Sequence, residues 1–113
     1  MDERVEKWLY DILLSIEEID GFFESNERVF ETFRQNLILK RAIERNLEII
    51  GEAVNRILTK DGNIVIENAR KIVGLRNHII HSYDNISDEV VWAIVINHIP
   101  KLKKEICKLL NLG

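Results

Sequence analysis

The sequence predicts an all-α fold, an antiparallel bundle of four or five helices. Its 113 residues include one proline and only five glycines, so few positions interrupt a helix. Apolar residues recur mostly at spacings of three and four rather than two, which is the period of helices and not of strands. The breaks between the periodic segments are short, which favours antiparallel neighbours. The length is typical of one domain, and we expect a single domain over residues 1–113.

The first half of the chain predicts two long helices and a short one between them. The first runs from about Glu3 to Phe23, with Asp2 as a plausible N-cap. Its apolar stripe comprises Val5, Trp8, Leu9, Ile12, Leu13, Ile16 and Ile19. A short helical piece follows around 29–33, and a long helix runs from about Asn36 to Leu58. This long helix has two apolar stripes, one of which comprises Ile38, Ala42, Ile49 and Ala53. Two stripes fit either a central helix of the bundle or an oligomer interface, and both readings stay open.

The second half predicts two more helices. After a turn at 59–63, a helix runs from about Ile66 to His81 or Ser82. The last helix is capped by Ser87 or Asn85 and should be kinked at Pro100.

The composition argues against several classes of protein. The charged, acidic N-terminus is unlike a signal peptide, and no apolar run approaches the roughly 18 residues of a spanning helix, so we expect a cytoplasmic protein with no membrane contact. The lone Cys107 should be a buried small hydrophobe, and three histidines without a cysteine pair predict no metal site. A net charge of -3 leaves no global footprint for nucleic acid, so RNA binding requires a local basic patch.

The helix predicted over 66–81 separates its residues into two arcs. One arc is apolar, and the opposite arc carries Arg70, Lys71, Asn77, His78 and His81. Arg76 and Tyr83 break the partition because they project from the apolar side. An arginine there is costly to desolvate unless it is paired, with Glu52 as a candidate partner, or lines a cavity. Tyr83 could equally be a core tyrosine with a satisfied hydroxyl.

The segment from Arg76 to Tyr83, Arg-Asn-His-Ile-Ile-His-Ser-Tyr, resembles the signature of HEPN ribonucleases in its HepT-like form. The flanking sequence is similar as well. Arg41-Ala42 and Gly51-Glu52-Ala53 resemble that branch's second helix, and 72–77 resembles its approach to the motif. Val91-Trp92 and 98–102 resemble its last helix. The resemblance implies a HEPN-type helical bundle that forms a homodimer.

The resemblance also implies a metal-independent endoribonuclease with no cofactor. His81 would be the acid–base group and Arg76 the ligand of the scissile phosphate, with Asn77 in support. These residue types suit the chemistry, because RNA supplies its own 2′-hydroxyl nucleophile, histidine transfers protons near neutral pH, and arginine offers a planar fork to phosphate. His78 would be a supporting basic residue at most, His98 a surface or structural residue, and Trp92 a core residue.

Regulation follows from the same resemblance. The chain would be the toxin of a toxin–antitoxin pair, with a minimal nucleotidyltransferase as the antitoxin, and Tyr83 would accept AMP from that partner.

Arg76 and His81 are five residues apart, hence about 140° apart on a regular helix. Either the helix distorts near His81 or a homodimer shares the site.

Two other functions remain open on the sequence. One is a catalytically inactive HEPN module that only binds a nucleotidyltransferase or a nucleotide. The other is a dimeric helical adaptor, which the acidic pI of about 5.6 favours. The presence of Arg76, His81 and Tyr83 together argues for the ribonuclease.

Overall fold

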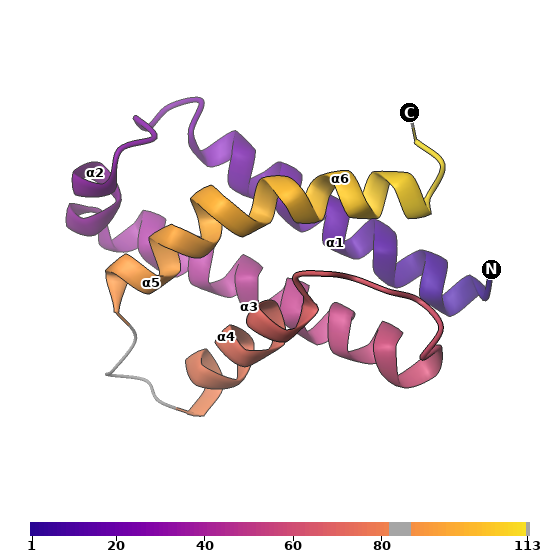
Figure 1. The fold of residues 1–113 in the computed structure, drawn as a ribbon. Helices are drawn as coiled ribbons and strands as arrows, with labels where there is room; N and C mark the ends of the chain where they lie inside the picture. The colour runs from indigo at the N-terminus through magenta and orange to yellow at the C-terminus, as the bar shows by residue number, and fades with distance from the viewer. Residues whose placement is uncertain (82–86, 113) are drawn as a thin grey trace.

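The computed structural model describes residues 1–81 and 87–112, without the side chains of Ile80 and His81. Its elements follow in the order α1 (Glu3–Phe22), α2 (Phe30–Gln35), α3 (Leu37–Lys60), α4 (Ala69–His81), α5 (Asp88–Ala93), the π-helical turn η1 (Ile94–His98) and α6 (Ile99–Leu109). Within the described ranges every regular element is helical, which confirms the predicted all-α class. Figure 1 shows α1 and α3 running in opposite directions, with α6 lying along α1.

Three helices, α1, α3 and α5, begin where the sequence predicts a start, because a polar side chain caps each of them. The fourth predicted helix begins at Ala69, three residues after the predicted start at Ile66. The Asp2 carboxylate accepts the backbone N–H of Arg4 at 2.7 Å, and Asn36 Oδ1 accepts that of Leu39 at 3.0 Å. Ser87, one of the two predicted caps of the last helix, accepts the N–H of Val90. Asn85, the other, lies outside the described residues.

The core lies where α1, α3, α4 and α6 meet. It is formed by the predicted stripe of α1 and one stripe of α3, together with apolar residues of the later helices. Fully buried members include Leu9, Ile12, Ile16, Ile43, Leu47, Ile50, Ile72, Leu102 and Ile106. Each side chain of this size contributes about 1.5–3 kcal/mol when it is removed from water. Trp8, predicted in the same stripe, is only half-buried at the edge of the core.

The second stripe of α3 ends up on the outer face of the bundle. Ala53 is buried, Ala42 and Ile49 are half-buried, and Ile38 is 84% exposed. Because α3 also packs against both α1 and α4, it is a central helix as one reading had it. The exposed part of the stripe keeps the interface reading open as a prediction.

The last helix absorbs Pro100 through a change of winding. Just before the proline, the N–H of Ile99 donates to the carbonyl of Ile94, five residues back, which defines η1. Pro100 then occupies the first turn of α6, where its missing N–H costs little. A disturbance was expected at this position, and the structure places it one turn earlier as a π-helical turn.

Two further expectations can be compared with the structure. In the described ranges, no helix is both long and apolar enough to cross a membrane. Cys107 is half-buried rather than buried, because its position on α6 is at the rim of the core.

Candidate functional site

Arg76 lies where α4 crosses α3, and Gly51 allows the crossing to be close. A Cβ added at Gly51 would lie 2.4 Å from Arg76 Cβ and 3.1 Å from the Ile72 carbonyl oxygen. Only a residue without a side chain fits such an approach. Gly51 therefore fixes how near the base of the Arg76 side chain comes to the backbone of α3.

The Arg76 guanidinium is held by neighbours on two helices. Nη2 forms an ion pair with Glu52 Oε2 on α3, and Nη1 donates to Asn77 Oδ1 at 2.8 Å. The other Glu52 oxygen, Oε1, accepts from Arg56 Nε at 3.0 Å. The expected Arg76–Glu52 pair is thus confirmed, and Arg56 is a second partner that the sequence did not reveal.

Two polar atoms of this cluster are not fully satisfied. Arg76 Nε and Glu52 Oε2 are both buried and have no hydrogen-bond partner among the described residues. Glu52 Oε2 is close enough to Nη2 for an ion pair, but the pair lacks the direction of a hydrogen bond. A buried donor without an acceptor lowers the stability by about 1–3 kcal/mol. Arg76 Nε can therefore still donate a hydrogen bond to an acceptor atom of a ligand.

Arg76 also lines a cavity of about 310 Å³ on the outer face of α3, flanked by α1 and α4. The arginine is therefore both paired and at a cavity, the two conditions that make its position tolerable. The walls of this outer cavity combine apolar and charged side chains, namely Trp8, Asp11, Arg45, Glu48, Ile49, Glu52, Ala53, Arg56 and Arg76.

The other predicted site residues are described to different extents. Asn77 is exposed and contacts Arg76 directly. His81 is the last residue of α4, but its side chain lies outside the described part, and so does the whole of Tyr83. The structure therefore unites Arg76 with Asn77 and leaves their relation to His81 and Tyr83 as a prediction. Because the backbone of α4 is α-helical as far as position 81, positions 76 and 81 lie about 140° apart around its axis.

The remaining residues of the polar arc lie on the solvent side of α4, as expected. Arg70, Lys71 and His78 are exposed. Lys71 and His78 line a second cavity of about 400 Å³ together with Gly74, Leu75 and residues of α5 and its cap. Position 81 lies seven residues after Gly74, which is about two helical turns, so the two positions are on the same face of α4.

His98 belongs to a separate, structural network. Asn68 Nδ2 donates to Glu105 Oε1 at 2.9 Å, which turns Asn68 Oδ1 toward His98 Nδ1, 2.8 Å away. Because a carbonyl oxygen only accepts, Nδ1 is the protonated ring nitrogen. Burial, followed by the charges of Lys71 and Lys101, lowers the pKa of His98 below its ordinary value. This confirms the structural role predicted for His98.

Trp92 lies at the other end of the bundle. Its ring is 5.2 Å from that of Phe33 and 5.8 Å from that of Phe23, centre to centre. It packs against the core but is only partly buried. Trp92, predicted as a core residue, therefore lies at the rim of the core, as Cys107 does.

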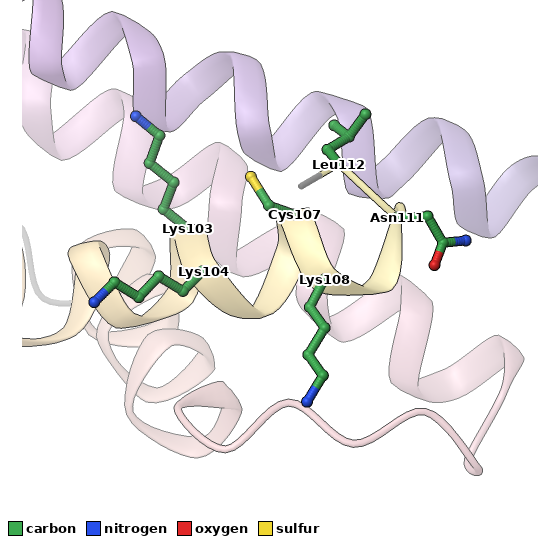
Figure 2. A pocket seen from close by; sticks show the side chains of 6 residues that line it. All are labelled: Lys103, Lys104, Cys107, Lys108, Asn111 and Leu112. Carbon is green, nitrogen blue, oxygen red and sulfur yellow. The ribbon is translucent and has the colours of Figure 1, made fainter.

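A cavity of about 570 Å³ lies at the C-terminal end, drawn in Figure 2. Its walls come from α6 and the residues just after it: Lys103, Lys104, Cys107, Lys108, Asn111 and Leu112. Lys103 is paired with Asp20 at 3.1 Å. Figure 2 shows Lys103 and Cys107 on one side of the helix and Lys104 and Lys108 on the other. Arg76 and Asn77, the predicted catalytic and supporting residues whose side chains the structure describes, do not line this cavity despite its size.

Trp8, like Arg56, is a lining residue of the outer cavity that sequence reasoning missed. The spacing of α1 placed it in the core stripe, and its half-buried position at the edge of that stripe became visible only in the structure. Its place next to Val5 and Leu9, at the margin of the apolar stripe of α1, was the available signal.

Among the described residues, no group of three or more histidine, cysteine or acidic side chains is arranged to hold a metal ion.

The fold and the site together define a class: a small helical protein with a paired arginine in a cleft, on a helix that ends in histidine. A family model described as "Ribonuclease HepT-like" matches residues 12–109, and the chain belongs to this family, a branch of the HEPN superfamily. This confirms the resemblance found in the sequence.

Three curated relatives cover most of the chain. A Methanocaldococcus jannaschii protein named "Putative RNase MJ1380" is 38% identical over 104 residues, which is 90% of this chain and 93% of the relative. "Probable ribonuclease HepT" of Thermococcus cleftensis is 35% identical over 90% of this chain and 92% of the relative. "Putative RNase TTE0752" of Caldanaerobacter subterraneus is 35% identical over 73% and 74%. No solved structure matches the chain.

Proposed function

We propose that this chain is the toxin of a HEPN toxin–antitoxin pair and that it cleaves RNA without a metal ion. The observation that carries the proposal is the placement of Arg76. In a chain of the Ribonuclease HepT-like family, the motif arginine lines a cleft and has a buried donor without a partner. A phosphate oxygen is the acceptor that such a donor suits best.

The proposed reaction needs proton transfer and charge stabilisation only. The 2′-hydroxyl oxygen attacks the adjacent phosphorus, and the bond from phosphorus to the 5′-oxygen breaks. His81 removes the proton from the 2′-hydroxyl or delivers one to the leaving 5′-oxygen, and Arg76 binds the phosphate oxygens as negative charge builds up. The products are a 2′,3′-cyclic phosphate and a 5′-hydroxyl.

The Arg76–Glu52 pair has a defined part in this proposal. Glu52 holds the guanidinium from one side while Asn77 accepts from Nη1. A phosphate that takes Nη and Nε together would satisfy the donor that is now without a partner, and Glu52 would keep its bond to Arg56. Glu52 is thus a positioning residue for Arg76 and not a catalytic one.

The proposal includes a homodimer in which the two copies share the site. Two observations support it. Positions 76 and 81 lie about 140° apart around the axis of α4, which makes it difficult for one copy to direct both residues at one phosphate. The outer face of α3 also exposes Ile38, which lies about two helical turns before Arg45, the first cavity-lining residue of that helix. A two-fold axis near α4 would bring Arg76 of one copy toward His81 of the other.

The antitoxin in this proposal is a minimal nucleotidyltransferase that transfers AMP to Tyr83. Tyr83 lies two positions after His81 in the sequence. An adenylyl group there would bring a phosphate to the cleft, pair with Arg76 and exclude RNA by charge and volume. Co-expression followed by peptide mass spectrometry tests this step. An unmodified Tyr83 in a neutralised complex would mean that the partner covers the site instead.

The direct test is cleavage of RNA by the purified chain in EDTA. We expect 2′,3′-cyclic phosphate ends, and cleavage slowed by at least about 10²-fold in Arg76→Ala and in His81→Ala when both variants are folded by circular dichroism. Expression of the parent should slow growth, and the two variants should relieve this. Cleavage that chelation abolishes and magnesium restores would refute the metal-independent chemistry.

A second candidate, an inactive HEPN module that binds a nucleotidyltransferase, is favoured by one observation. Arg76 is already paired with Glu52, which would also suit a purely structural arginine. The two candidates differ in a single readout, since the inactive module binds its partner equally well with and without His81 and cleaves no RNA in either form.

A further inference from the structure

The outer cavity contains more than the phosphate ligand. Besides Arg76, its walls include the apolar side chains of Trp8, Ile49 and Ala53. Trp8 packs partly against the core and partly lines the cavity, so its indole is held in place by the bundle. Proteins that bind single-stranded nucleic acids stack a base on a fixed aromatic side chain of this kind, next to a cationic side chain that binds the phosphate.

The charges around the cavity compensate one another. Three carboxylates and three guanidinium groups line it, and each carboxylate has a cation beside it. These pairs are Asp11 with Lys7 at 2.9 Å, Glu48 with Arg45 at 3.5 Å, and Glu52 with Arg56 at 3.0 Å and with Arg76. Such a lining neither repels nor strongly attracts a second phosphate, and it suits an uncharged, flat, hydrogen-bonding group.

The size of the cavity limits what it can hold. Its volume of about 310 Å³ is at the lower end of the roughly 300–1,000 Å³ typical of small-ligand pockets. One nucleoside fits this scale, whereas a stack of several bases does not. Arg76 is one of the lining residues, so a phosphate bound to it would bring its attached nucleoside to this cavity.

From these observations we infer that the outer cavity is a nucleoside subsite, in which the indole of Trp8 stacks on the base next to the phosphate bound by Arg76. The inference rests on the proposed function in one respect only, namely that the ligand is RNA. It adds a recognition residue on α1, the helix farthest in sequence from the motif. Stacking is tolerant of base identity, so this subsite contributes affinity and not sequence preference.

Tryptophan fluorescence provides a test that does not depend on cleavage. The chain has two tryptophans, and Trp92→Phe leaves Trp8 as the only one. The probe is a five-nucleotide RNA with 2′-O-methyl groups throughout, which has no free 2′-hydroxyl and stays intact. We expect saturable quenching of Trp8, and binding about tenfold weaker in Trp8→Leu, which corresponds to the loss of one stacked base. Trp8→Phe, which keeps an aromatic face, should bind nearly as well as the parent.

Tyr10→Leu is the matched control, because Tyr10 is an exposed aromatic residue of the same helix and does not line the cavity. It should leave binding of the probe unchanged. A probe with abasic positions should bind the parent about tenfold more weakly, and Trp8→Leu should add no further loss. If Trp8→Leu does not fold, Ile49→Glu, on the half-exposed face of α3, closes the cavity to a base in its place.

The outcomes separate this inference from the proposed function. Quenching of Trp8 by the probe, without cleavage of ordinary RNA, supports the subsite and refutes the ribonuclease. Cleavage of ordinary RNA with an unchanged KM in Trp8→Leu, together with no change in Trp8 fluorescence, refutes the subsite and leaves the ribonuclease standing.

Discussion

Two polar clusters hold neighbouring helices together, and they differ in how completely their atoms are paired. Around His98, the side chains of Asn68 and Glu105 bond to each other, to the imidazole and to the backbone N–H of Glu67. Around Arg76, one guanidinium nitrogen and one carboxylate oxygen are buried without a hydrogen-bond partner among the described residues. A cluster that serves only stability tends to close on itself, whereas one that binds a ligand keeps donors available.

The largest expected effect follows from removing the donor itself. Arg76→Ala should lower kcat for RNA cleavage by about 10²–10³, the cost of losing one preorganised donor to a developing charge. Arg34→Ala is the matched control, because Arg34 is also an ion-paired arginine but lies on α2, outside the cavity. Single-turnover cleavage measures both variants. Equal activities would show that the Arg76 cluster is as structural as the one around His98.

The close approach of α3 and α4 gives the next effect. Gly51→Ala introduces a Cβ only 2.4 Å from Arg76 Cβ, so α4 must move away, and the free energy of unfolding should fall by about 1–3 kcal/mol. Gly74→Ala is the control within α4, because a Cβ there meets nothing within 4 Å. It should be neutral or stabilising by up to about 1 kcal/mol. Urea unfolding compares the two, and equal stabilities would contradict the close crossing.

Glu52→Gln tests the positioning role with the shape preserved. The pair is partly exposed, with side-chain accessibilities of 24% for Arg76 and 35% for Glu52, so we expect a loss of only about 1 kcal/mol in stability. The guanidinium loses its counter-charge and its orientation, so kcat should fall while KM stays the same or decreases. A double-mutant cycle with Arg76→Gln, read by urea unfolding, measures the coupling without any activity. Additive effects in that cycle would argue against the pair.

The smallest effect concerns the closed cluster. The pKa of His98 is lowered in the folded protein, so this residue takes up a proton more readily when the chain unfolds. The stability contributed by neutral His98 is fully present above the unfolded value of 6.5 and decreases as the pH falls toward the folded pKa. Urea unfolding at pH 7.5 and pH 5.5 should show a smaller pH dependence in His98→Gln than in the parent. Identical dependences would assign the effect to other groups.

The sequence predicted most of the fold, because helix periodicity and caps are local. The bounds of α1 and α3, the caps at Asp2 and Asn36 and the capping by Ser87 follow from residues within one helical turn. The π-helical turn was less accessible, because it depends on how α6 must rotate to bury Leu102 and Ile106 after Pro100. The resemblance supplied Arg76 and Asn77, which the structure joins. The two arcs of the predicted helix suggested Glu52 as a partner of Arg76. The roles of Gly51, Arg56 and Trp8 could not be predicted, because they depend on how three helices pack together.

The π-helical turn also constrains how the chain can change in length. Winding five residues into Ile94–His98 allows Val91 before the turn, Ile94 and Val95 within it, and Ile99, Leu102 and Ile106 after it to face the same core. Five residues in this turn cover about the same rotation as four residues of an α-helix, so deleting one residue there would restore ordinary winding and leave α6 facing nearly the same way. Inserting a residue in α6 just after the turn would instead rotate the rest of the helix by about 100° and turn Leu102 and Ile106 from the core toward water. The mostly exposed connection at 24–29 has no such constraint, so insertions and deletions are both tolerated between α1 and α2, whereas the turn before α6 tolerates only the deletion.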